Sequence, residues 1–213
     1  MCDGVVRNMM IPTTYDAHYL ENIPFPAAED LQSRLSQEVA SGDSPGAFVF
    51  AQHPQVITVG HNALKSHILS SPQTLASQGI SIAYTDRGGG VSYHGPGQVL
   101  LYPILRIRGR YSVRSYVALL QTLVSDTLKS FGLNPKIRNE TPGVWIGHRK
   151  ISSIGIRIRG GIATHGLSLN VSGDLVGLDH VLSLIHISEP TRPRLLSYAV
   201  VCVKKRRGGG GGG

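Results

Sequence analysis

Apolar residues recur along this chain at two spacings, one typical of helices and the other typical of strands. Leu31, Leu35 and Val39 lie four residues apart, which predicts an amphipathic helix that ends at Gly42. Residues 112–132 keep the helical period throughout, so they predict a second and stronger amphipathic helix.

Shorter apolar runs predict strands. Residues 47–51 and 56–59 predict two of them, and a hairpin is the simplest arrangement for runs so close in the chain. Residues 97–108 predict a mid-sheet strand, in which Pro103 would mark an edge or a bulge because proline cannot donate to a ladder. Strict alternation over 154–159, followed by a Gly-Gly turn and renewed alternation, predicts a strand pair. The pattern therefore predicts an α/β fold of the α+β type, with a mixed β-sheet and packed helices.

Residues 183–213 differ from the rest of the chain. They have no sustained periodicity, two closely spaced prolines, a basic run and six terminal glycines. Residues 183–192 also resemble the translation of a sequencing adapter. We therefore expect the native sequence to stop near Leu182, followed by a non-native, disordered tail. A genuine disordered basic tail is the alternative.

The net charge of +8 is concentrated in that tail. Six of the 21 Lys/Arg but only one of the 13 Asp/Glu lie there, so the other residues carry +3. A basic nucleic-acid-binding domain would rest on the tail alone, and we expect no nucleic-acid partner. We also expect no membrane association, because no apolar run is long enough to span a bilayer. The two cysteines lie at opposite ends of the chain, which argues against a disulfide framework.

The segment RGGGVSYHGPGQ, residues 87–98, places three glycines in a row between predicted strands. Consecutive glycines destabilise a strand, so they indicate that something approaches the main chain closely or that φ turns positive. The segment is not a P-loop, because no Gly-Lys-Ser/Thr follows, and its spacing differs from the dinucleotide fingerprint. A nucleotide site is therefore disfavoured.

Three other segments share this character: residues 52–63 (QHPQVITVGHNA), 149–155 (RKISSIG) and 164–171 (THGLSLNV). In this order and spacing the four segments resemble the lipoyl(octanoyl) transferases, over about residues 31–181. The resemblance implies the fold of the biotin and lipoate protein ligase catalytic domains, with an acyl chain held in a tunnel.

The resemblance also implies a substrate-binding set. Glycine backbone would lie against a fatty acyl chain, and its free N–H groups would meet the thioester carbonyl oxygen as charge develops on it. The set comprises Arg87, Gly88, Gly89, Gly90, Val91, Ser92, Tyr93, His94, Ser153, Ile154, Gly155, His165, Gly166, Leu167 and Ser168.

Lys150 matches the family's catalytic lysine, which would favour a neighbouring cysteine thiolate and exchange protons. From the residues alone, a solvated lysine beside Arg149 is the better interpretation, and only the resemblance reverses it. His94 and His165 would hold loops by hydrogen bonds or, as the resemblance implies, position substrate. The histidines show no paired ligand spacing, so we expect no metal, and the resemblance implies no cofactor.

The activity implied is that of an octanoyltransferase of lipoate biosynthesis with a cysteine acyl-enzyme. The cysteine would take the octanoyl group from octanoyl-acyl carrier protein, and the ε-amine of a target lysine would then attack the acyl-enzyme. The acceptors would be the lipoyl domains of 2-oxo acid dehydrogenases and the glycine cleavage H protein. Members of this family work in mitochondria in eukaryotes and in the cytoplasm in bacteria, and the N-terminal sequence does not decide between them.

The nucleophile is expected in a Pro-Cys-Gly motif at about Leu184, where this chain already carries the tail. Cys202 lies in an apolar run and Cys2 at the N-terminus, so neither is a good substitute. We therefore expect no turnover by the chain as written. The regions expected are an N-terminal extension, an incomplete acyltransferase domain and the tail, at residues 1–26, 27–182 and 183–213.

An ATP-dependent lipoate protein ligase of the same fold is the enzymatic alternative. Ligases have a related glycine-rich segment, but the continuation YHGPGQ, in place of their Tyr-His-Asp type, favours the transferase.

Overall fold

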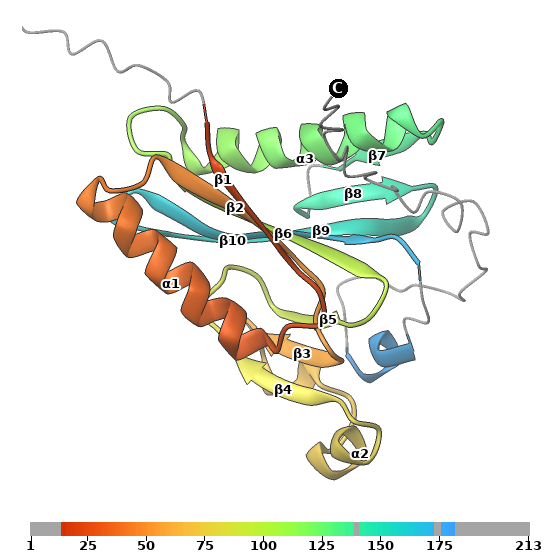
Figure 1. Cartoon of the computed structure of the whole chain (residues 1–213). Helices are drawn as coiled ribbons and strands as arrows, with labels where there is room; N and C mark the ends of the chain where they lie inside the picture. Colours follow the sequence, from red (N-terminus) through yellow and green to blue (C-terminus); the bar gives the residue numbers. More distant parts are fainter. Residues whose placement is uncertain (1–13, 139–140, 173–175, 182–213) are drawn as a thin grey trace, which may run out of the picture.

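The computed structural model describes residues 14–138, 141–172 and 176–181. Seven of the described strands form one mixed sheet, and three others form a smaller sheet beneath it (Figure 1). The large sheet contains β1 (Asp16–Leu20), β2 (Gly46–Ala51), β6 (Gln98–Arg106), β7 (Pro135–Ile137), β8 (Gly143–Ile146), β9 (Arg149–Arg159) and β10 (Ile162–Asn170), in the spatial order β1-β2-β6-β10-β9-β8-β7. The small sheet contains β3 (Val56–Val59), β4 (Ser81–Tyr84) and β5 (Val91–His94), in the order β4-β3-β5.

The helices complete the predicted α/β architecture, which is confirmed. The structure has α-helices α1 (Phe25–Ser41), α2 (Pro72–Ser77) and α3 (Val113–Ser130), and 3-10 turns η1 (Lys65–His67) and η2 (Val176–His180). Helices α1 and α3 lie on opposite faces of the large sheet, and α2 lies at the far end of the small sheet (Figure 1). No helix in the described ranges is long and apolar enough to cross a membrane.

Helix α1 covers one face of the large sheet with its predicted apolar stripe. Leu35 and Val39 pack in one buried cluster with Val49 of β2 and Ile104 of β6. The helix ends as predicted at Gly42, which takes the left-handed conformation with a φ of 93°. Its backbone N–H donates to the Glu38 carbonyl of the last turn.

Helix α3 covers the opposite face. Its buried residues Leu120 and Val124 pack against Leu101 of β6 and Val144 of β8. Neighbouring strand residues divide between the two faces, since Leu100 belongs to the α1 cluster and Leu101 to the α3 cluster. The predicted helix over 112–132 is therefore confirmed, and the helical spacing of its apolar residues corresponds to the stripe that is buried.

The predicted hairpin between residues 47–51 and 56–59 is wrong, although both strands exist. Strand β2 pairs with β1 and β6 in the large sheet, whereas β3 pairs with β4 and β5 in the small one. The chain crosses between the sheets at His53, whose Nδ1 donates to the Ile23 carbonyl at 2.7 Å. Its Nε2 accepts from the Tyr102 hydroxyl at 2.7 Å. Two hydrogen bonds to distant residues thus hold a crossing that local pattern cannot reveal.

Pro103 lies in a central strand and not at a sheet edge, because β6 pairs with β2 on one side and β10 on the other. The pairing with β10 is interrupted between Leu105↔Ala163 and Leu101↔Leu167, opposite Pro103. The missing N–H of proline therefore falls where the ladder is irregular.

The predicted pair of strands after residue 154 is confirmed as β9 and β10, which pair antiparallel. Gly160 and Gly161 form the turn with φ values of 58° and 82°, which is the geometry that favours glycine at both central positions. The predictions for the tail, Cys2 and Cys202 lie outside the described residues.

Candidate active site

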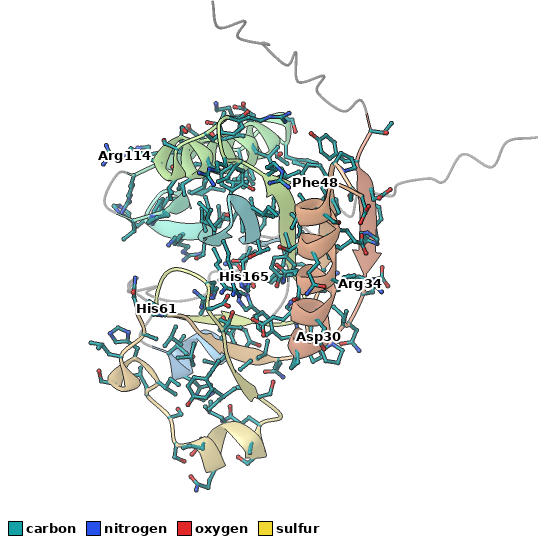
Figure 2. All side chains as sticks on the ribbon, turned by 90° about the vertical axis from the view of Figure 1, so that its left-hand side faces the viewer. Asp30, Arg34, Phe48, His61, Arg114 and His165 are labelled. Atoms are coloured by element: carbon teal, nitrogen blue, oxygen red, sulfur yellow. The ribbon has the colours of Figure 1, made fainter. Side chains whose placement is uncertain are left out.

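A cavity of about 360 Å³ lies where the small sheet meets the large one. It is lined by the glycine-rich segment before and within β5, by β9 and β10, and by the first turns of α3. Figure 2 shows His165 at this junction, between the two sheets. Every site residue predicted from the sequence lines the cavity except Tyr93.

Tyr93 belongs to the apolar cluster of the small sheet. Its ring is 2% exposed and packs with Ile57 and Leu75, and its hydroxyl donates to Gln55 at 3.2 Å. In β5 successive side chains point to opposite faces, so Ser92 and His94 face the cavity while Tyr93 faces away.

Several lining residues carry no sequence signal for a site. Most are apolar or aromatic, and periodicity alone assigns such positions to the core. They are Phe25, His67, Leu100, Tyr102, Val113, Val117, Thr141, Pro142 and Ile156.

Arg87 holds the glycine-rich loop in place. Its guanidinium is buried and donates to the carbonyls of Gly88 at 3.0 Å and Gly90 at 2.9 Å, and to the Thr58 hydroxyl at 2.8 Å. Burial lowers the pKa of Arg87 to about 10, which still leaves it protonated at neutral pH. Arg87 therefore links the glycine-rich loop to β3 by hydrogen bonds.

Two neighbouring segments enclose the loop. From one side Gly60 N donates to Gly90 O at 3.1 Å and Asn62 N to Gly89 O at 3.1 Å. On the other side Gly88 N donates to Ile156 O of β9 at 2.9 Å. The N–H groups of Gly89 and Gly90 themselves have no hydrogen-bond partner in the described part of the chain. They remain available to a ligand.

The approach is too close for side chains. A Cβ on Gly60 would stand 2.6 Å from Gly89 O, and a Cβ on Gly155 would stand 3.0 Å from Gly88 O. Gly89 also has a φ of 88°, which favours glycine. Gly60 lies in the 52–63 segment, yet sequence reasoning did not single it out as a site residue.

His94 is kept neutral by burial and belongs to a buried chain of hydrogen bonds. Gln98 donates through Nε2 to Asn170 at 2.8 Å, so its carbonyl oxygen faces His94 Nδ1, which donates to it. His94 Nε2 therefore accepts from the Thr58 hydroxyl, 3.2 Å away. Burial lowers the pKa of His94 to about 3, so it is an acceptor towards Thr58 at all physiological pH values. Sequence analysis did not identify Thr58, Gln98 or Asn170. Thr58 and Asn170 bond to residues distant in the chain, whereas Gln98 lies only four residues after His94.

His165 occupies an unusual backbone position with a φ of 53°. Its backbone N donates to Gln32 Oε1 of α1 at 2.8 Å, and its Nε2 lies 3.3 Å from Asp86 Oδ1. The other Asp86 oxygen pairs with Arg157. Burial lowers the pKa of His165 despite Asp86, and Nδ1 is buried with no partner among the residues that the structure describes.

Lys150 lies at the other side of the cavity, at the start of β9. Its Nζ stands 5.2 Å from the centroid of the Trp145 ring, and no carboxylate of the described ranges pairs with it. Burial lowers the pKa of Lys150 to about 8, so a fraction of roughly one in ten is neutral at pH 7. A half-buried amine of this kind can both accept and donate a proton near neutral pH.

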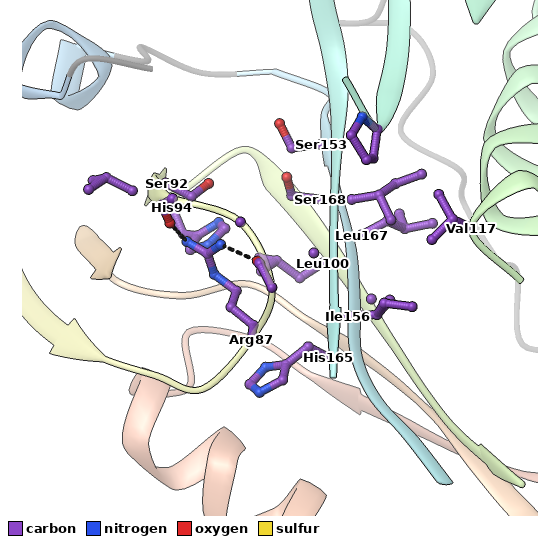
Figure 3. Close-up of a pocket in the computed structure, with 18 of the residues that line it drawn as sticks. Arg87, Ser92, His94, Leu100, Val117, Ser153, Ile156, His165, Leu167 and Ser168 are labelled. Carbon is purple, nitrogen blue, oxygen red and sulfur yellow. Dashed lines mark hydrogen bonds between the residues drawn. The ribbon is translucent and has the colours of Figure 1, made fainter. Parts of the chain in front are cut away.

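The cavity extends around the free edge of β9. Strand β8 pairs with β9 only as far as Ser153. Beyond Ser153 this edge of β9 faces the glycine-rich loop, which bonds to it through Gly88 N. Figure 3 shows Arg87 and His94 on one side of β9 and β10, and Val117 on the other. The site therefore combines a polar part at the loop with an apolar part beneath α3.

Within residues 14–138, 141–172 and 176–181, no three His, Cys, Asp or Glu side chains lie close enough to hold a metal ion. The cavity lining includes glycine backbone, the Lys150 amine, whose pKa burial lowers to about 8, and apolar side chains.

A family model for the lipoyl protein ligase A/B catalytic domain matches residues 26–197. The chain belongs to this family. The sequence resemblance is thereby confirmed. The matched range includes residues 183–197 of the expected tail, which lie outside the described residues, and the domain boundaries stay a prediction.

Curated relatives carry the name octanoyltransferase. One from Chloroflexus aurantiacus is 39% identical over 173 residues, covering 79% of this chain and 78% of that protein. One from Chromohalobacter salexigens is 42% identical over 139 residues, covering 65% of this chain and 60% of that protein. The mitochondrial octanoyltransferase LIP2 of Arabidopsis thaliana is 32% identical over 176 residues, covering 82% and 75%. The predicted class of enzyme, an acyltransferase, agrees with these relatives.

Solved structures share the fold. The P. falciparum LipL1 structure in complex with lipoate has a TM-score of 0.65 at 15% identity, covering 81% of this chain and 53% of that chain. A lipoate-protein ligase A bound with ATP has a TM-score of 0.63 at 18% identity, covering 79% of this chain and 71% of that chain. The predicted ligase-like fold is confirmed.

Proposed function

We propose that this chain is an octanoyltransferase of lipoate biosynthesis, which moves an octanoyl group from octanoyl-acyl carrier protein to a lysine of a lipoyl domain. One observation carries the proposal: a single cavity brings the glycine-rich loop, with unbonded N–H groups at Gly89 and Gly90, together with Lys150. The names of the curated relatives support octanoyl as the acyl group.

The geometry supports a role for each part of the site. The acyl chain lies along the glycine backbone, and the amides of Gly89 and Gly90 donate to the thioester oxygen as it gains negative charge. Ser153 and Ser168 line the cavity beside the loop. His94, neutral and bonded on both ring nitrogens, keeps β5 in position.

Lys150 moves the protons in both steps. A cysteine thiolate attacks the octanoyl thioester, a new thioester forms, and the carrier thiolate leaves with a proton from the Lys150 ammonium. The lysine amine of the lipoyl domain then attacks, an amide forms, and Lys150 takes the proton that the amine releases while the cysteine leaves as thiolate.

The nucleophile of this proposal is the cysteine expected at about Leu184, which this chain does not carry. The chain as written therefore binds octanoyl thioester but does not turn it over. The acceptors are lipoyl domains of 2-oxo acid dehydrogenases and the glycine cleavage H protein. The compartment is the mitochondrion in a eukaryotic source and the cytoplasm in a bacterial one, and relatives of both kinds match the chain.

Mass spectrometry tests the proposal on two chains incubated with octanoyl-acyl carrier protein and a lipoyl domain. The chain as written should form no stable adduct and transfer no octanoyl group. A variant with Ser183→Pro, Leu184→Cys and Ile185→Gly should acquire an octanoyl thioester on the new cysteine and octanoylate the lipoyl domain. The transcript downstream of the Val181 codon should encode Pro-Cys-Gly.

Binding gives a readout that does not need turnover. Trp145 is the single tryptophan of the chain and lies next to Lys150, so octanoyl thioester should change its fluorescence. An adduct on Cys202 in the chain as written would contradict the expectation that this chain has no working nucleophile. Transfer from free acid with ATP, and none from the thioester, would identify a ligase instead.

A further inference from the structure

Lys150 lies in an irregular part of β9. The pairing with β8 joins Val144 to Ser152 and then Trp145 to Lys150, so Ile151 is an extra residue on the β9 side. This two-against-one arrangement is a β-bulge.

The bulge decides which way Lys150 faces. Residues three apart in a regular strand point to opposite faces. Ile151 and Ile154 are three apart, yet both pack in the apolar cluster beneath α3, which shows that the alternation shifts between them. Lys150 pairs with Trp145 and Ser153 pairs with Gly143, and these two β8 residues are two apart, so Lys150 and Ser153 point to the same face. Both line the cavity.

Gly143 provides the surface on which the Lys150 side chain lies. A Cβ added to Gly143 would stand 2.2 Å from Lys150 Cε and 3.2 Å from its Nζ. It would also stand 2.5 Å from the Ser152 carbonyl oxygen, which belongs to the backbone of β9. Any side chain at this position would push the lysine away and strain the strand pair.

Helix α3 holds Gly143 from behind. The Gln121 side chain is 8% exposed, and its Nε2 donates to the Gly143 carbonyl at 3.0 Å. A long-range hydrogen bond thus ties the helix to the residue that supports the lysine.

No ion pair of the described part of the chain holds the Lys150 ammonium. The Trp145 ring lies beside it, and the other cation at that ring is Arg138, whose guanidinium carbon is 5.3 Å from the centroid. Arg149 precedes it on β9. Among the described residues these charged neighbours are cations, so the contacts that place the ammonium there are Trp145 and the surface of Gly143.

We propose that Gly143 and Gln121 are positioning residues for Lys150: the bare Cα of Gly143, held from α3 by Gln121, lets the lysine stem lie flat so that its ammonium reaches the cavity. The inference rests on the proposed role of Lys150 in acyl transfer. It adds to the site one residue of α3 and one residue of β8, neither of which lines the cavity.

The test measures the titration of Lys150 in the full chain without octanoyl thioester or lipoyl domain. Trace acetylation with acetic anhydride over a pH series, followed by mass spectrometry of the Lys150 peptide, gives the pH at which the amine becomes reactive. The midpoint should lie near 8 in the unmodified chain. Gly143→Ala should raise it by about one pH unit or more, because the displaced ammonium regains water. Gln121→Leu should raise it by a smaller amount.

Gly147→Ala is the matched control. Gly147 lies in the turn of the same hairpin with a φ of 59°, and a Cβ there would meet nothing within 4 Å. It should lower thermal stability through backbone strain but leave the Lys150 midpoint unchanged.

An unchanged midpoint in folded Gly143→Ala would overturn the proposal. If that variant does not fold, Gln121→Leu decides, and an unchanged midpoint there overturns it equally. Since the acetic anhydride test needs no octanoyl thioester, its failure is separate from failure of octanoyl transfer, which the thioester assay measures.

Discussion

At the residue scale, the site depends on positions where a methyl group does not fit. The loop at residues 88–90 passes so close to Gly60 and Gly155 that a Cβ on either would crowd its carbonyl oxygens. Arg87 donates to the carbonyl oxygens of Gly88 and Gly90. Backbone thus takes the place that side chains usually occupy. A ligand can then approach main-chain N–H groups directly.

Gly60 and Gly90 offer a paired test of this packing. Gly60→Ala places its Cβ 2.6 Å from the Gly89 carbonyl, so the loop must move, and we expect a loss of about 1–3 kcal/mol in the free energy of unfolding. Gly90→Ala meets only His67 Nδ1 at 3.6 Å, so its effect should stay within about 1 kcal/mol. Urea unfolding followed by Trp145 fluorescence measures both. Equal losses would show that the loop is not closely packed at Gly60.

At the element scale, α3 serves the fold and the site together. Its buried stripe packs on the sheet, its first turns line the cavity through Val113 and Val117, and its Gln121 holds Gly143. The glycine-rich loop likewise joins two elements, because it leads into β5 and bonds to β9. The site is therefore formed by contacts between elements.

Adjacent leucines of α3 separate the two faces of the helix. Leu120 is 3% exposed and Leu119 is 45% exposed. We expect Leu120→Ala to reduce the free energy of unfolding by about 2–5 kcal/mol through the lost burial and the cavity left behind. Leu119→Ala should change it by less than about 0.5 kcal/mol. Urea titration of the two variants checks the orientation of the helix, and similar losses would contradict it.

At the scale of the whole molecule, three buried histidines lie where the two sheets meet. His53 is at the crossing, His94 in the small sheet and His165 in the large one. The His53 and His94 ring centroids are 6.3 Å apart. Burial is the first cause of a lowered pKa in each of them.

The lowered pKa values of these histidines predict a loss of stability in mild acid. Each has a lower pKa in the folded than in the unfolded chain, so below about pH 6.5 the unfolded chain binds more protons and stability falls with pH. The limit is about 1.4 kcal/mol per pH unit for each histidine. Glu29, whose pKa is raised by burial, works in the opposite direction.

Urea unfolding at pH 7, 6 and 5 measures this dependence. The free energy of unfolding should decrease at each step, and His53→Gln should make the decrease smaller. A flat profile between pH 7 and 5 would show that the histidines are not buried as neutral groups.

Predictions from local pattern succeed in this chain where one element decides the outcome. The helices ending at Gly42 and near Phe131, and the Gly160–Gly161 turn, follow from periodicity and from residues that tolerate positive φ. The β2–β3 hairpin fails because each strand pairs with partners far away in the chain. Periodicity shows that a face is buried but not what covers it.

The sequence by itself determined the family, the two long helices, several of the strands, and three of the four segments singled out by motif that meet in the cavity. Only the tertiary structure decided that Tyr93 faces away from the cavity, that Val117 lines it and that Gly143 supports Lys150. The reason is physical. Motifs and periods are properties of neighbours along the chain, whereas cavities and close contacts arise between residues that packing brings together from distant positions.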